Sequence, residues 1–424
     1  MMRWFDDRLA LERLYAKYLR KSFPVHHSFY LGEIALAAFG TLVVTGAYLS
    51  VSYIASGHVV RLGGVTAPEA YASITYIDSL PLGRVIRGVH HWSAHIMIAA
   101  LLLHLVRVFV TGAYRNPREI NWWVGVTLLV VTTVEAFTGY ALPDDAFAVT
   151  ATKIGYGIAA SIPWLGSWMA RVLFGGVYPT VHSLPRLAAA HVLWMPFALL
   201  GLVTLHLVIM IKQKHTQPPY ARRIAPGRIL GVPLWPNQTS MLAIVFFLYL
   251  AVVFTLSGSL DVHPIQVFGP PTAATPDVRP DWYFLWIYGI LQIMPPWHFE
   301  FWGGTFGPEL FAGVLVPGGV LLLLLSVPAL DRSSHPLVYA ELPSQHARRL
   351  GVLGGGFVFF GVATLAGFHR EVGLSPGWVW VLLLGAPLVV ASTIGWLVRR
   401  LVPQARRTGL RRRTSAQAAT PGRG

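Results

Sequence analysis

Long apolar segments separated by polar and charged ones dominate the pattern along the chain. Eight of them are about 17–25 residues long, the length that a helix needs to cross the hydrocarbon core of a bilayer. They lie at about residues 30–54, 92–111, 123–142, 187–211, 241–258, 309–328, 352–368 and 378–398. The pattern predicts an all-α polytopic membrane protein with eight transmembrane helices.

Three long loops, at about 56–91, 143–186 and 259–308, fall on one side of the membrane in this arrangement. Two of them contain apolar or amphipathic pieces, Ser161–Phe174 and Trp282–Met294. Both pieces are too short to span a bilayer, so we expect interfacial helices there. Long structured loops gathered on one face usually carry function.

Composition agrees with a membrane protein. Charged residues make up 12% of the chain and hydrophobic residues 54%, whereas soluble domains contain about 25% charged residues. The mean hydropathy is +0.55. The net charge of +15 could indicate nucleic acid, but the apolar runs make membrane topology the better explanation. We therefore expect membrane lipid around the chain and no nucleic-acid partner.

Most of the 33 Lys and Arg residues lie in the two terminal segments and in the loops that follow the second, fourth and sixth spans. The positive-inside rule then places both termini in the cytoplasm, which requires an even number of spans. The first 29 residues lack the apolar core and cleavage site of a signal peptide. We expect a multi-pass protein of the bacterial cell membrane.

The chain contains no cysteine. This excludes disulfides, a thiolate iron–sulfur cluster, a covalently attached c-type haem and a Cys-based zinc site. Any metal or haem must be held by His, Met, Tyr or carboxylate side chains.

Four histidines lie within, or just at the edge of, two of the predicted spans. His90 and His104 are 14 residues apart, and His191 and His206 are 15 apart. At about 100° per residue, each pair lies close to one helix face with a separation of about 21 Å along the axis. The second and fourth spans run in the same direction, so His90 is level with His191 near the outer surface and His104 with His206 near the inner one.

Two stacked bis-histidine sites are the interpretation that we favour, because ionisable groups within spans are rare and usually functional. Simple hydrogen bonding between helices is the alternative. A di-metal carboxylate site would need Glu-x-x-His motifs, which are absent at these positions. His91 is on the wrong face to pair with His104. His91 and His95 could bind a metal as an i, i+4 pair, but we interpret them as polar neighbours near the interface.

Glycines in the neighbouring spans repeat the same spacing. Gly32 and Gly46 are 14 residues apart in the first span, and Gly125 and Gly139 are 14 apart in the third. A missing side chain gives a flat haem ring room beside the backbone. The matched spacing predicts that these four glycines are cofactor-binding positions.

Two arginines lie three residues from a histidine, one near each membrane edge. Arg87 precedes His90, and Arg107 follows His104. Each is placed to pair with a haem propionate, although an interfacial arginine that extends to the headgroups would have the same position.

With these features, the chain resembles the cytochrome b subunit of the quinol–cytochrome c oxidoreductase (cytochrome bc) family over nearly its whole length. The resemblance also rests on Thr138–Pro143 and on Pro280–Tyr283, which looks like the family's Pro-Glu-Trp-Tyr motif with Asp in place of Glu. Leu142–Asp145, Lys214–Gln217 and Pro295–Trp302 are similar to the actinobacterial form in particular.

The resemblance implies a bifurcated reaction in a respiratory complex. Quinol would be oxidised near the outer face, and electrons would cross the membrane through two non-covalent b-type haems to an inner quinone site, contributing to proton translocation. The implied partners are a Rieske iron–sulfur protein, a c-type cytochrome, a terminal oxidase and a second copy of the complex. Menaquinone is the expected quinone. A covalent third haem is excluded, because Tyr30 stands where one branch of the family has cysteine.

The same resemblance points to residues of the quinol site. Asp281 would accept a proton from quinol, with Tyr283 and Tyr140 lining the pocket. An alternative role for Asp281 is the N-cap of the following helix. Glu135, within the third span, is predicted to belong to an outward proton path. Asp144 and its neighbour could relay protons or bind a partner, unless they belong to a plain surface loop.

The domain organisation that we predict has five parts. Residues 1–29 form a cytoplasmic amphipathic segment, 30–215 the four-helix di-haem domain and 216–240 a cytoplasmic linker. Residues 241–400 form a four-span domain with the outer quinol-site loop, and 401–424 a basic cytoplasmic tail.

Two other functions fit parts of the pattern. A di-haem membrane anchor of another quinone-linked oxidoreductase would have the histidine pairs but usually fewer spans and no Pro-Asp-Trp-Tyr loop. A secondary transporter could use intramembrane histidines for protons, but it would show broken helices and inverted halves.

Overall fold

The computed structural model describes residues 22–261, 265–272 and 278–402, with Arg8, Glu12, Leu19 and Arg20 as isolated positions. The predicted amphipathic N-terminus and basic tail lie mostly outside these residues. Eight described helices are long and apolar enough to span a membrane, as predicted. They are His27–Ser50, Gly83–Val110, Glu119–Tyr140, Ser183–Gln213, Leu234–Ser259, Pro308–Leu330, Ala347–Ala366 and Pro376–Leu401.

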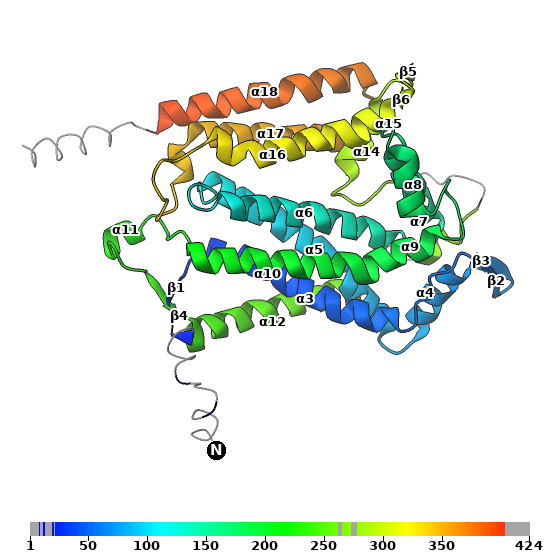
Figure 1. Ribbon diagram of the computed structural model, residues 1–424, viewed down its shortest axis with the longest axis horizontal. Helices are drawn as coiled ribbons and strands as arrows, with labels where there is room; N and C mark the ends of the chain where they lie inside the picture. The colour runs from blue at the N-terminus through cyan, green and yellow to red at the C-terminus, as the bar shows by residue number, and fades with distance from the viewer. Residues whose placement is uncertain are drawn as a thin grey trace, which may run out of the picture.

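The first four spans form the predicted bundle (Figure 1). Helix α3 (Tyr30–Ser50) packs along α5 (Gly83–Val110), and α6 (Glu119–Tyr140) packs along α10 (Met195–Gln213). Apolar side chains of all four helices meet in one buried cluster; its members include Phe39, Val89, Met97, Leu128 and Leu199.

Helix α5 begins at Gly83 rather than near residue 92. The apolar stretch in the sequence starts later because Arg87, His90 and His91 interrupt it. A helix tolerates such residues when their side chains point into the protein. The apolar pattern of the sequence therefore predicted the start of this helix too late.

The second half of the chain is divided between two sides of the bundle. Helix α12 (Thr239–Ser259) packs on α5 and α3, whereas α16 (Val316–Leu330) packs on α6. Helices α17 (Ala347–Ala366) and α18 (Pro376–Leu401) form the far layer, at the top of Figure 1.

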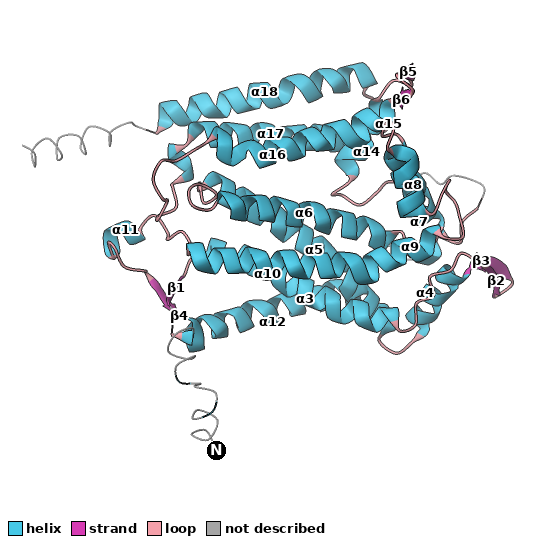
Figure 2. Ribbon diagram, viewed as in Figure 1, coloured by secondary structure: helices cyan, strands magenta, loops and turns pink. Residues whose placement is uncertain are grey.

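The loops collect at the two ends of the helices. At the end that carries the basic loops, β1 (Ser22–Pro24) pairs with β4 (Gly231–Pro233). At the other end lie two hairpins, β2 (Val59–Leu62) with β3 (Val65–Pro68) and β5 (Phe299–Phe301) with β6 (Gly304–Phe306). Figure 2 shows these short strands, which an all-helical prediction does not include, at the helix ends.

Short helices cover the loop-rich end, which we call the outer end. They are α4 (Glu69–Ser79), α7 (Ala146–Ala160), α8 (Gly166–Phe174), α9 (Ser183–Ala189), α13 (Ile265–Phe268) and α14 (Leu285–Ile293). The predicted interfacial helices therefore exist as α8 and α14, with later starts than expected. Helix α8 begins only at Gly166. The backbone of Ala160 approaches closely there, since a Cβ at Gly166 would lie 2.0 Å from the Ala160 carbonyl oxygen, so this position requires glycine.

At the opposite, inner end, hydrogen-bonded charged side chains connect the loop after α5 with the segment between α16 and α17. Arg349, on α17, is buried and hydrogen-bonds to Asp331 (Nε–Oδ2 2.7 Å) and to Glu341. Arg115, in the loop after α5, donates to Glu341 at 2.9 Å. Burial raises the pKa of Asp331, but hydrogen bonds from Tyr114 and Arg349 outweigh it and hold that pKa below its ordinary value.

Candidate functional site

The outer histidine pair brings together imidazoles from two spans. The ring centroids of His90, on α5, and His191, before α10, lie 6.1 Å apart with the ring planes at 72°. Two imidazoles that bind one metal ion from opposite sides, at about 2 Å each, put their centroids about 6 Å apart. The Nδ1 atom of His90 is 2.9 Å from Thr45 Oγ1, which leaves Nε2 for a metal. The pair therefore fits a bis-histidine haem.

A local change of helix geometry sets the position of His191. Residues Ala190–Trp194 form a π-helical turn between α9 and α10. Such a turn accommodates one more residue than an α-helical turn and is frequent at functional sites. It explains how a spacing of 15 residues to His206 can match the spacing of 14 between His90 and His104.

The carboxylate of Glu135 is the unexpected neighbour of His191. Its Oε1 lies 3.2 Å from His191 Nδ1, and its backbone oxygen lies 3.1 Å from the same atom. Thr138 Oγ1 is 3.3 Å away. Partners of this kind fix the orientation of a ligating imidazole and raise its basicity.

The inner pair has a different setting. His104, on α5, is an electrostatic neighbour of His206, on α10. Among the described residues, the buried Nδ1 of His104 and the buried Nε of Arg107 have no hydrogen-bond partner. The guanidinium carbon of Arg107 lies 4.3 Å from the centroid of the Phe29 ring. The unpaired buried guanidinium nitrogen of Arg107 is what a bound acidic group, such as a haem propionate, would satisfy.

Each of the four predicted glycines faces one of the four histidines. At the outer level, a Cβ at Gly46 would lie 3.2 Å from His90 Cε1, and one at Gly139 would lie 2.5 Å from His191 Cε1. At the inner level, a Cβ at Gly32 would lie 3.2 Å from His104 Cε1, and one at Gly125 would lie 3.4 Å from His206 Cε1. Two glycines thus lie at the outer level and two at the inner level. The contact at Gly139 is the tightest.

Arg87 has a protein partner that the sequence did not indicate. Its guanidinium makes two 2.7 Å hydrogen bonds to Asp78 at the end of α4. The pair is largely buried, with side-chain exposures of 16% and 9%. This contact anchors α4 to the start of α5; the propionate roles of Arg87 and Arg107 remain predictions.

The structure brings the three predicted quinol-site residues together at the outer end. Tyr283 donates a 2.8 Å hydrogen bond to Oδ2 of Asp281, and burial together with this carboxylate raises the pKa of Tyr283. Tyr140, at the end of α6, packs edge-on against Phe284 with centroids 5.9 Å apart. Asp281 is not the N-cap of α14: that position is Phe284, without a side-chain cap.

The surface-loop and partner-binding expectations for the acidic pair after Pro143 do not describe Asp145, and its proton-relay role stays a prediction. Asp145 is fully buried and caps α7 by accepting from Ala148 N at 2.8 Å. It is therefore neither part of a plain surface loop nor available for a partner. Burial and the neighbouring carboxylate of Asp145 raise the pKa of Asp144 to about 6.

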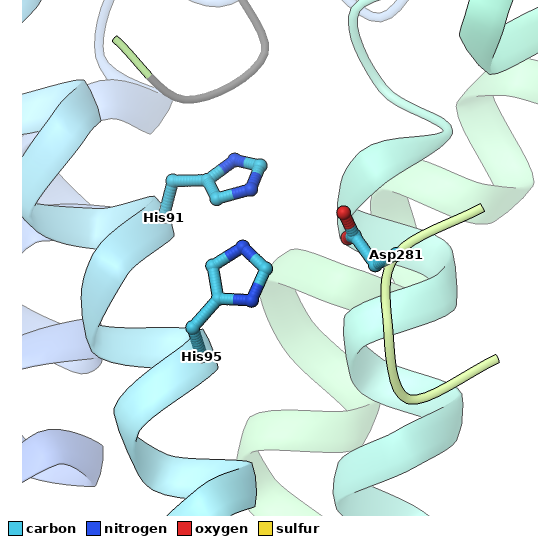
Figure 3. A group of neighbouring side chains, drawn as sticks. All are labelled: His91, His95 and Asp281. Atoms are coloured by element: carbon cyan, nitrogen blue, oxygen red, sulfur yellow. The ribbon is translucent and has the colours of Figure 1, made fainter. Parts of the chain in front are cut away.

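Sequence reasoning left His91 and His95 without a role, yet both lie beside Asp281. Figure 3 shows the two imidazoles, from adjacent turns of α5, facing the carboxylate. One ligand atom from each of the three residues lies within 4.8 Å of the others. The i, i+4 spacing was the available signal for the two histidines, but nothing in the sequence indicated that Asp281 lies beside them. Trp282 Nε1 donates to His95 Nδ1 at 3.1 Å.

A small cavity opens at the inner end of α10. Its volume is about 30 Å³, and Phe23, Met210, Lys214 and His215 are among its lining residues. That space holds about one water molecule, so a larger ligand would require the lining side chains to move.

Sequence comparisons identify relatives over most of the chain. Two family models match, described as "Cytochrome b(N-terminal)/b6/petB" over residues 95–270 and "Cytochrome b(C-terminal)/b6/petD" over residues 270–364. The similar proteins are named cytochrome bc1 complex cytochrome b subunit. The one from Streptomyces coelicolor is 37% identical over 77% of this chain and 61% of its own length.

Further relatives from Mycobacterium bovis and Corynebacterium efficiens are 34% and 32% identical, over 87% and 93% of this chain. This chain spans 70% and 75% of their lengths. A solved structure titled "Hyperthermophilic respiratory Complex III" has the same fold, with a TM-score of 0.71 at 24% identity, covering 94% of this chain and 98% of that one.

Proposed function

Because this chain belongs to the cytochrome b family of bc1-type complexes, we propose that it is the haem-carrying subunit of a respiratory quinol:cytochrome c oxidoreductase. The observation that carries the proposal is the 6.1 Å separation of the His90 and His191 rings. Bound haem supplies reversible one-electron transfer there, since two histidine ligands leave no iron position open to oxygen or substrate.

The outer site is proposed to oxidise quinol. Asp281 accepts a proton from the quinol hydroxyl, because it is a carboxylate at the outer end with Tyr283 hydrogen-bonded to one oxygen. Tyr140 lines the same pocket. The reaction is bifurcated: one electron of each quinol passes to an iron–sulfur partner, and the other crosses the membrane to the inner quinone site.

Glu135 is proposed to serve the outward proton path as well. Its carboxylate lies 3.2 Å from His191 Nδ1, so it also orients that imidazole. The Glu135→Gln variant separates the two roles by the pH profile. Loss of the orienting contact alone should shift the outer haem potential without changing the pH dependence of turnover, whereas loss of a proton carrier should change that pH dependence. Unchanged turnover at every pH would leave Glu135 as an orienting residue alone.

The inner site is proposed to reduce quinone beside the small cavity at the end of α10. Lys214 and His215 provide polar groups there, and Phe23 provides an aromatic wall. The cavity lies at the end with the basic loops, which we assign to the cytoplasm. Both termini then lie in the cytoplasm, with the quinol site on the outer face.

The proposed partners follow from the family. They are a Rieske iron–sulfur protein, a c-type cytochrome and a second copy of the complex, with a terminal oxidase attached in a larger assembly. Menaquinone is the proposed substrate.

A reduced-minus-oxidised optical spectrum of the purified complex tests the proposal. We expect two low-spin b-type haems per chain, and one fewer in His90→Leu and His206→Leu variants. A well-folded preparation without haem would overturn the proposal. Inhibition by an outer-site quinol analogue distinguishes a quinol:cytochrome c oxidoreductase from a di-haem anchor, in which that site has no counterpart.

A further inference from the structure

Arg279 lies two residues before Asp281 and holds the loop before α14 to the turn between α17 and α18. Its Nε donates to the backbone oxygen of Gly367 at 3.2 Å, and its guanidinium carbon lies 4.4 Å from the centroid of the Phe368 ring. The guanidinium also forms an ion pair with Glu371. From these contacts we propose that Arg279 is a positioning residue of the outer site, which fixes where the Asp281 carboxylate meets quinol.

The three contacts of the guanidinium are not equally important. The Glu371 side chain is 51% exposed, and an ion pair in contact with water contributes little. Gly367 is buried, and a hydrogen bond from a charged donor is about twice as strong as one between neutral groups. A planar guanidinium can donate along its edge and stack by its face at the same time. The anchor therefore depends mainly on Gly367 and Phe368.

The chain between this anchor and the carboxylate is short and stiff. Pro280 fixes its own φ at about −65° and favours an extended conformation at Arg279 before it. Two residues of chain span at most about 7 Å. The chain turns directly after Asp281, whose backbone oxygen accepts from Phe284 N at 2.8 Å. A displacement at the anchor would therefore be passed on to the Asp281 carboxylate.

The turn that receives Arg279 is itself firmly placed. His369 is buried in this turn. Helix α14 packs on the same end of α17, where a Cβ at Gly289 would lie 1.9 Å from the Ala363 carbonyl oxygen. The segment that contains Asp281 is thus attached to the outer end of α17 both before and after the carboxylate.

This inference rests on the proposed role of Asp281 as the proton acceptor. Proton transfer requires the two heavy atoms to approach within about 2.6–3.2 Å. A displacement of about 1 Å, caused by a change away from the reacting atoms, can slow a reaction about 100-fold. Arg279 therefore acts through Asp281, and loss of the anchor should slow quinol oxidation.

Steady-state quinol oxidation by the detergent-solubilised complex tests the anchor. Arg279→Gln should lower kcat by about tenfold or more, with an unchanged haem spectrum because both histidine pairs stay intact. Glu371→Gln should lower kcat less, since its carboxylate is the more exposed contact. Arg370→Gln is the matched control: it removes an exposed arginine from the same turn and should leave kcat as in the parent.

The double variant Arg279→Gln/Asp281→Asn separates positioning from a general loss of structure. If Arg279 acts through Asp281, its removal has no further effect once the carboxylate is gone. The double variant should then be as slow as Asp281→Asn alone, whereas an independent structural loss would multiply with that of Asp281→Asn. Phe368→Leu removes only the ring face and should behave in the same way, which keeps the test valid if Arg279→Gln binds less haem.

The positioning role and the proton acceptor can fail separately. If Asp281→Asn is slow while Arg279→Gln and Phe368→Leu have the parental kcat, or if the losses multiply, the positioning role is wrong and the proton acceptor stands. Parental turnover in Asp281→Asn would refute the proton acceptor, and a slow Arg279→Gln would then have to be explained without that carboxylate.

Discussion

The two histidine pairs differ mainly in what surrounds the Nδ1 atoms of their imidazoles. At the outer level, Thr45 Oγ1 lies 2.9 Å from His90 Nδ1, and the Glu135 carboxylate lies 3.2 Å from His191 Nδ1. Thr45 donates its own proton to Thr41 O at 2.7 Å, so it accepts from His90. Both outer ligands therefore have hydrogen-bond acceptors behind them.

At the inner level, no described side chain accepts from either histidine, and a cation lies nearby. Neither His104 nor His206 has a side-chain partner at Nδ1 among the described residues; the backbone of Asn121 is near His206. Arg107 lies close enough to His104 to interact with it electrostatically. A positive charge therefore lies beside the inner ligands, and no described side chain accepts from their Nδ1 atoms.

Under the proposed function, this difference predicts an order for the midpoint potentials of the two haems. Acceptors and a carboxylate behind a ligand stabilise oxidised iron and lower its midpoint potential. A nearby cation stabilises reduced iron and raises that potential. The outer haem should therefore have the lower potential, which favours transfer from the quinol site toward the inner face. A redox titration of the two haems that gave the reverse order would contradict this comparison.

The largest expected effect is loss of the outer haem in Gly139→Ala. The new methyl would lie 2.5 Å from His191 Cε1 and 3.1 Å from its ring nitrogens, so the ligand must move. We expect about half of the haem per chain by pyridine haemochrome assay. Gly40→Ala is the matched control, because a Cβ there meets nothing within 4 Å. Full haem occupancy in Gly139→Ala would contradict the requirement for a glycine beside His191.

The next largest effect is expected for Glu135→Gln. The amide keeps the shape but replaces one of the two carboxylate oxygens beside His191 by an NH₂ group. We expect the midpoint potential of the outer haem to rise by about 60 mV, which corresponds to about 1.4 kcal/mol for one electron. The inner haem, measured in the same titration, is the internal control. Equal shifts of both haems would show that the carboxylate does not act through His191.

Arg107→Gln should lower a midpoint potential rather than raise it, and it should do so at the inner haem. Loss of the guanidinium beside His104 should lower the midpoint potential of the inner haem by up to about 60 mV. The potential gap between the haems would then narrow. A fall in the outer potential instead would contradict the assignment of Arg107 to the inner level.

The smallest effect is expected for Thr45→Val, which removes the neutral acceptor behind His90. A hydrogen bond of this type contributes about 0.5–1.5 kcal/mol, so the outer potential should rise by only about 20–60 mV. Thr133→Val is the matched control, since that hydroxyl bonds only to Leu129 O within its own helix. If Thr45→Val shifted the outer haem potential more than Glu135→Gln does, Thr45 rather than Glu135 would be the main influence on that potential.

Much of the fold could be predicted from sequence, because two constraints operate locally. A span must be apolar over the thickness of a bilayer, and residues on one helix face recur with a fixed period. These constraints gave the eight spans, the two histidine levels and the four glycines. They failed at the start of α5, where Arg87 and His90 interrupt the apolar run but face inward.

By itself, therefore, the sequence determined which residues lie at the same depth in the membrane. Only the tertiary structure decided which of them touch. The π-helical turn at Ala190–Trp194, the Glu135–His191 contact and the approach of Asp281 to His95 all depend on how distant segments pack. Depth follows from position along one helix, whereas a contact across helices depends on crossing angles, side-chain rotamers and loop paths that no local pattern records.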